Sequence, residues 1–127
     1  MKSGRQGERG QAAVELALAL PLLALLALAL LQVTLVVRDQ VLLTHAAREA
    51  AREAAVSADR GAARAGALSG TRGLEPDRLV VTTSGRRGTG SRVTASLTYR
   101  SATDVPLVGR LVGDVRLSAA VTMRVET

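Results

Sequence analysis

This chain has few of the residues that build cross-links, metal sites and aromatic cores. It contains no Cys, Trp or Phe, and Tyr99 is its one aromatic residue. The absence of Cys excludes disulfides and thiolate metal ligands. With a single aromatic side chain, base stacking on nucleic acid is almost excluded. Any folded domain must therefore depend on a modest aliphatic core.

Residues that could carry out catalysis are also scarce. His45 is the single histidine and has no partner for metal binding or acid–base chemistry, and no nucleophile–base pair is visible. The segment GRRGTG at 85–90 lacks the Lys-Ser/Thr ending of a phosphate loop, which favours a solvated turn. Asp104 and Asp114 flank a loop without a ligand series. We therefore predict that the protein is not an enzyme and has no cofactor, metal, nucleic-acid partner or small-molecule substrate.

The basic excess does not by itself indicate a binding surface. The chain has 17 Lys and Arg against 11 Asp and Glu, a net charge of +6. Most of this excess lies in residues 38–127, where 14 Arg oppose nine acidic residues and leave +5. Only one of the 17 basic residues is Lys. This Arg bias, together with the abundance of Ala, is more typical of a GC-rich genome, although a basic exterior favours anionic surfaces at low salt.

Charge is absent between Glu15 and Arg38, where the chain reads LALALPLLALLALALLQVTLVV. About 20 apolar residues span a bilayer core at a helical rise of about 1.5 Å each, and Leu and Ala are strong helix formers. Residues 11–37 therefore form a predicted transmembrane helix. It contains two residues that are costly in lipid: Glu15 near its start and Pro21, which is expected to kink it.

The helix is expected to continue outside the membrane with a different pattern. Residues 38–70 read as an amphipathic helix in which AAREAAREAA at 46–55 forms a stripe of alanines. Two interpretations stay open: an exposed helix of high propensity, or packing against the C-terminal strands or neighbouring subunits. Glycines weaken the helix toward Gly70, its expected stop. The two helices together predict a rod from about Gln11 to about Ala58, about 70 Å long.

The periodicity changes from helical to two in residues 74–127, which we predict to be a small antiparallel β domain. Apolar and polar residues alternate over 79–83, 93–100 and 115–126. The Gly-rich segment 84–91 is typical of a hairpin loop. Strands with one apolar face need a cover, for which the helix is available. The expected class is α+β, with a long helix and about three strands. An apolar cluster falls between the last two strands, at Val105, Leu107, Val108, Leu111 and Val112.

A peptidase motif precedes the apolar run. Residues 1–10, MKSGRQGERG, are basic and Gly-rich and are expected to be disordered and cytoplasmic. This leader, followed by Gly10, four residues and Glu15, resembles a type IV prepilin class III signal. The resemblance implies cleavage by a membrane aspartyl peptidase between Gly10 and Gln11, which is not the Phe usual at this position. Glu15 would become the fifth mature residue, favoured by the positive helix end and able to pair with a neighbour's N-terminal amine.

The segment GQAAVELALALPLL more specifically resembles the TadE-like branch of the pseudopilins, where Pro follows Glu by six residues as Pro21 follows Glu15. The AAREAAREAA repeat and the closing strand LSAAVTMRVE are similar to TadE as well. The resemblance implies a pilin-like fold and a minor pilin or assembly factor of the tight-adherence (Flp, type IVc) machinery. Its partners would be the prepilin peptidase, other pilins and tad-type assembly proteins. It would sit in the cytoplasmic (inner) membrane with its C-terminal domain outside, or in the pilus or at its base.

An alternative is a secreted small binding domain with a conventional signal peptide. Ala27-Leu28-Ala29 fits an A-x-A cleavage site. Against this, the apolar run continues through Val37, and Glu15 is unusual in the apolar part of a signal peptide. The mature N-terminus distinguishes the two.

Overall fold

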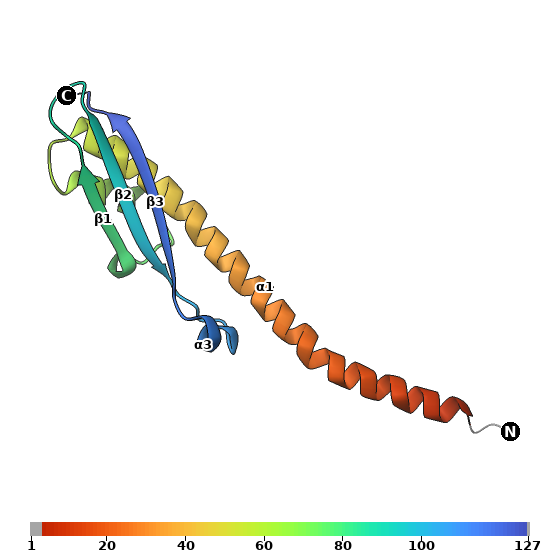
Figure 1. Cartoon of the computed structure of the whole chain (residues 1–127). Coiled ribbons are helices and arrows are strands. Elements are labelled where there is room, and N and C mark those ends of the chain that lie inside the picture. Colours follow the sequence, from red (N-terminus) through yellow and green to blue (C-terminus); the bar gives the residue numbers. More distant parts are fainter. Residues whose placement is uncertain (1–3, 127) are drawn as a thin grey trace.

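The computed structural model describes residues 4–126, with side chains described from Gly10 onward. A long helix leads into a small head in which two helices pack against a three-stranded sheet (Figure 1). This confirms the predicted α+β class, a long N-terminal helix followed by an antiparallel sheet. The elements are α1 (Gly4–Val56), α2 (Ala62–Gly70), the 3-10 turn η1 (Pro76–Arg78), β1 (Leu79–Ser84), β2 (Arg92–Ser101), α3 (Val108–Val112) and β3 (Val115–Arg124).

Helix α1 is the predicted rod. It runs without a break for 53 residues, about 80 Å at the usual rise, and ends at Val56 rather than Ala58. The expectation of a disordered leader is wrong for Gly4–Gly10, which are the first turns of α1. Once a helix is nucleated, each added residue costs little, so the Ala and Leu run can extend into the leader. Met1–Ser3 lie outside the described residues.

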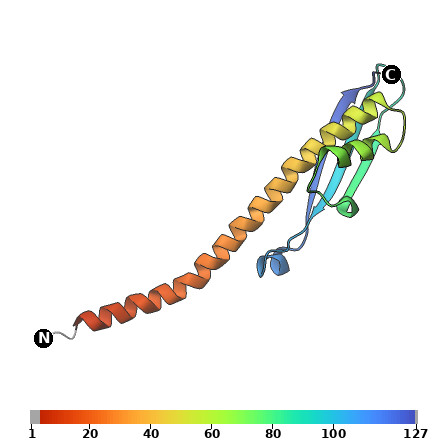
Figure 2. The same cartoon turned by 180° about the vertical axis from the view of Figure 1, so that it is seen from behind.

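The N-terminal half of α1 contains the proline. In both views the red-to-orange half of α1 turns away from the direction of the rest (Figures 1 and 2). Pro21 lies inside the helix and has no backbone N–H to donate to the carbonyl of Ala17. Proline is a common cause of bends in long helices. A local kink at Pro21 stays a prediction.

The helix expected over residues 38–70 is two helices in the structure, separated by a turn after Val56. The turn is stabilised by side chains that bind the backbone. The Ser57 hydroxyl oxygen accepts from the Asp59 N–H at 3.2 Å, and the Asp59 carboxylate accepts from the Gly61 N–H at 3.1 Å. Short polar side chains compete in this way with helical hydrogen bonds. Helix α2 consequently folds back beside α1 (Figure 2) and ends at Gly70, as expected.

The sheet has the order β1-β2-β3, with both neighbouring pairs antiparallel. Leu79 pairs with Tyr99, and Tyr99 pairs with Leu117, so one apolar row crosses all three strands. The predicted alternation is confirmed: β2 buries Val93, Ala95, Leu97 and Tyr99 on one face. The loop between β1 and β2 is the predicted hairpin connection. Its sharp path requires glycine, since Gly85, Gly88 and Gly90 all have positive φ.

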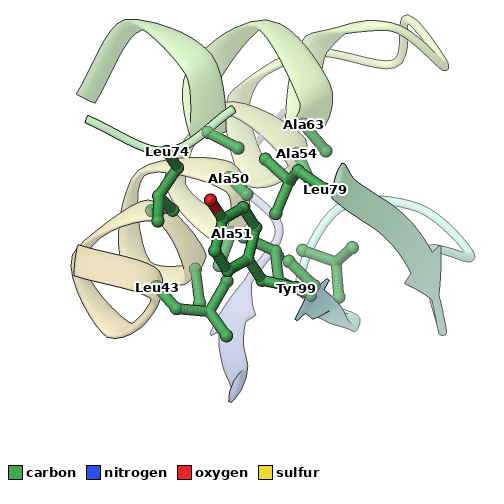
Figure 3. Packing of buried hydrophobic residues seen from close by; sticks show 14 of the residues in the cluster. Leu43, Ala50, Ala51, Ala54, Ala63, Leu74, Leu79 and Tyr99 are labelled. Carbon is green, nitrogen blue, oxygen red and sulfur yellow. The ribbon is translucent and has the colours of Figure 1, made fainter. Parts of the chain in front are cut away.

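The alanine stripe of α1 is the centre of the core. These alanines are at most 5% exposed, which favours packing over the exposed-helix interpretation. Alanine lets the helix backbone lie close to its neighbours: α1 contacts α2, β2 and β3, and α2 contacts β1. Tyr99 packs among them, and its hydroxyl oxygen accepts from the Glu75 N–H at 3.3 Å (Figure 3). The buried stripe comprises Ala46, Ala47, Ala50, Ala51, Ala54 and Ala55.

Candidate membrane anchor and assembly site

The N-terminal half of α1 exposes apolar side chains on every side. Helical residues advance by about 100° each, so the exposed leucines between Leu16 and Leu31 cover the whole circumference. Of the described residues, the stretch Gly10–Val56 contains a helix long and apolar enough to cross a membrane. Only 6% of its most apolar window is buried, unlike the core helix of a soluble protein. An all-round apolar surface of this kind is suited to lipid.

The four residues singled out by sequence lie along this exposed helix. The structure brings two of them together: the Gln11 side-chain amide donates to the Glu15 carboxylate, Nε2 to Oε1, at 3.3 Å. A Cβ built at Gly10 would meet no atom within 4 Å, so the backbone there is open to approach. Pro21 lies further along α1 and is exposed. Among the described side chains, no cation lies in salt-bridge range of Glu15.

A polar collar marks the point where the apolar run ends and the head begins. The Ser101 hydroxyl donates to the Asp39 carboxylate at 2.7 Å, and Asp39 lies 3.8 Å from Arg38. One residue on, the Gln40 side-chain amide donates to the Ser118 carbonyl at 3.2 Å. These contacts join the ends of β2 and β3 to α1. We define this polar collar as Arg38, Asp39, Gln40, Ser101 and Ser118. Sequence reasoning missed it, although Arg38 and Asp39 are the first charges after the run.

Arg86 holds the opposite end of the head. Its guanidinium donates to the carbonyl of Ala54 and, at 2.9 Å, to that of Ser57. The last carbonyls of a helix have no partner within it and carry partial negative charge, so a cation there is stabilising. The hairpin loop at 85–90 is exposed, as expected of a solvated turn, except that Arg86 is half-buried. This contact docks the loop on the C-terminal end of α1.

The outer face of the sheet carries like charges side by side. Arg92 lies directly opposite Arg124, and Arg100 opposite Arg116. Short polar residues, mainly Thr and Ser, fill the rows between them. Like charges in this relation repel.

His45 is exposed on α1. Among the described residues, no group of three or more His, Asp or Glu could hold a metal ion.

One exposed apolar helix that extends from a small α+β head is the architecture of a membrane-anchored, pilin-like protein. Residues 10–52 match the family model described as TadE-like protein. This match confirms the resemblance predicted from the motif over these residues: the N-terminal part of the chain is similar to TadE-like proteins. The matched segment includes Gly10, Glu15, Pro21 and the first part of the alanine repeat, whereas the sheet lies outside the matched segment. No curated protein and no solved structure matches the chain.

Proposed function

We propose that this protein is a minor pilin, or pseudopilin, that acts in the assembly of a tight-adherence (type IVc) pilus. One observation carries the proposal: a helix with apolar side chains on all sides has a carboxylate, Glu15, near its start, within a segment that matches the TadE-like family. A carboxylate in an apolar stretch is expensive and usually functional. The role is structural, through contacts with other subunits.

In the proposed arrangement the apolar half of α1 stays in the cytoplasmic membrane, with its N-terminus in the cytoplasm and the head outside. The prepilin peptidase cuts between Gly10 and Gln11. Glu15 then pairs with the N-terminal amine of an adjacent subunit and sets the register between two helices. The head offers the outer face of its sheet to other pilins or to tad-type assembly proteins. Its Arg pairs suit an acidic partner, which would relieve their repulsion.

The first test concerns processing at Gly10. When the protein is co-expressed with its cognate prepilin peptidase, we expect the intact mass to show loss of residues 1–10. The exposed helix and the open backbone at Gly10 support access by a membrane peptidase. Gly10→Leu replaces the small residue before the cut with a bulky one that should prevent cleavage, so this variant should keep the full mass. A mature chain that begins at Leu30 would instead support the secreted domain with a signal peptide, and an unprocessed chain would contradict cleavage.

Orientation is tested separately with fusions after Thr127. Prepilin-like insertion leaves the N-terminus inside, so an alkaline phosphatase fusion should be active, because that enzyme needs the oxidising side of the membrane. A matched green fluorescent protein fusion, exported in the unfolded state, should be dark. An inactive phosphatase with a bright fluorescent fusion would place the head in the cytoplasm and refute the proposed orientation.

A further inference from the structure

Helix α3 presents apolar side chains to solvent although the head has a core available. Leu111 is 85% exposed, and Leu107 and Val112 are about as exposed as the leucines of the α1 run. Helix α3 lies at the end of the sheet nearest the N-terminal half of α1 (Figures 1 and 2). A cluster of exposed apolar residues at one place usually marks an interaction surface.

The connection that contains α3 extends past the polar collar along the apolar run. Beyond Ser101 and before Val115 the chain leaves the sheet, and α3 contacts α1. On α1, one face is covered at this level: Leu28, Ala29 and Val36 are half-buried, and Gln32 is 5% exposed. Their spacing of three and four residues places them on one side of a helix. Since the run ends at Val37, α3 lies beside its last turns.

The exposed residues are held in place. Val105 is buried at the start of the segment, and its carbonyl accepts from the Gly109 N–H at 2.9 Å. The Thr103 hydroxyl donates to the Gly113 carbonyl and closes the segment. A Cβ at Gly109 would lie 1.9 Å from the Thr103 carbonyl oxygen, so this close turn requires glycine. Leu107 has a φ of 68°, which is costly for a residue other than glycine. The apolar side chains therefore point outward from a fixed turn.

We propose that α3 is a second membrane contact, in which Leu107, Leu111 and Val112 enter the boundary between headgroups and acyl chains beside α1. The proposal rests on the membrane anchoring proposed above. Residues 16–37 span about 33 Å as a helix, close to the thickness of a bilayer core. Their last turns, and α3 with them, then lie in the outer leaflet. The apolar surface of α3 is thus continuous with that of α1.

Two further features fit a lipid surrounding. Arg110 is exposed on α3, where its long side chain can reach phosphate groups while the leucines face the acyl chains. Gln32 lies within the apolar run, and its side-chain amide has no hydrogen-bond partner among the described residues. Polar side chains in membrane helices face protein rather than lipid. In the proposed arrangement, the segment that contacts α1 at this level shields the buried Gln32 from acyl chains.

Tryptophan fluorescence tests this contact directly, because the natural chain contains no Trp. The full-length Leu111→Trp variant is reconstituted in phosphatidylcholine vesicles whose acyl chains carry bromine either near the headgroup or near the chain end. We expect a blue-shifted emission that bromine near the headgroup quenches strongly and bromine near the chain end quenches less. Leu111 is the most exposed of these side chains, so the substitution should leave the fold intact.

Two matched variants make every outcome decisive. Ala120→Trp places the probe on the exposed outer face of β3, about 17 Å along the strand from Val115, and should not be quenched. Leu23→Trp places it within the apolar run and should be quenched by bromine near the chain end.

If Leu23→Trp is quenched but Leu111→Trp is not, α3 does not contact lipid, while the membrane anchor is supported. If Leu23→Trp is not quenched, the membrane anchor itself is refuted. Equal quenching of Leu111→Trp and Ala120→Trp would mean that the whole head lies on the bilayer, which overturns a contact confined to α3.

Discussion

Replacement of Glu15 by Ala is expected to leave the protein folded and inserted in the membrane but to impair its assembly with the pilus subunits proposed as its partners. The carboxylate lies in an exposed apolar helix and makes no contact with the head, so its loss should not affect the core. Removing a charge near lipid should ease insertion or leave it unchanged. If Glu15 pairs with a neighbour's N-terminal amine in a low dielectric, its loss leaves that cation unpaired. We expect co-purification to fall by about tenfold or more.

Two further variants separate charge from shape. Glu15→Gln keeps the size of the side chain but removes the charge, and it should be as impaired as Glu15→Ala. Gln11→Ala removes the hydrogen-bond donor that Glu15 has in the structure and should assemble almost normally, because that contact lies within one helix. Crosslinking in membranes and pilus counts measure the effect. Normal crosslinks and normal piliation in both Glu15 variants would show that Glu15 has no partner in the assembly.

The elements with a regular local pattern could be predicted from the sequence. The alternation over 115–126 predicts a strand, and β3 is Val115–Arg124. The Leu and Ala run predicts a helix through the whole anchor, and α1 is continuous there. The rod was predicted to end at about Ala58, and α1 ends two residues earlier, at Val56. The prediction of one helix over residues 38–70 was wrong, because the structure has two helices separated by a turn. Alanine is even more frequent in α2 (four of nine residues) than in α1 (13 of 53), so composition does not mark the break. The break depends on the Ser57 and Asp59 side chains that bind the backbone.

The site was predictable only where it is a linear motif. Gly10, Glu15 and Pro21 lie within a dozen residues, and their spacing can be read directly. The polar collar joins Asp39 to Ser101, which are 62 positions apart in the sequence. Arg86 binds the carbonyls of Ala54 and Ser57, which precede it by 32 and 29 positions. Neither pairing has a sequence pattern, because each depends on how the sheet lies against α1. The apolar cluster of the β2–β3 connection was visible in the sequence, but its exposure beside the anchor was not.

The approach of α2 to α1 depends on Gly66, and Gly66→Ala is expected to destabilise the head. From the sequence, this glycine only weakens a helix, and Ala there would be favourable by about 1 kcal/mol. In the structure, a Cβ at Gly66 would lie 2.8 Å from the Glu49 backbone oxygen and 2.7 Å from the Glu53 Cγ. The backbone of α1 cannot shift without disturbing the alanine stripe against the sheet. Overpacking of this kind costs about 1–3 kcal/mol, so we expect a net loss of stability.

Gly70→Ala is the matched control for this prediction. Its Cβ would meet the Glu49 side chain, with the Cγ at 2.7 Å and the Cβ at 3.1 Å, but no backbone atom of α1. The half-exposed Glu49 side chain can rotate away, so Gly70→Ala should cost less than Gly66→Ala. Urea unfolding of the full chain in detergent, followed by the emission of Tyr99 in the core, compares the two. Since the apolar half of α1 lacks aromatic residues, this signal reports on the head alone. A Gly66→Ala protein at least as stable as the natural chain would mean that α2 does not pack on the α1 backbone at this distance.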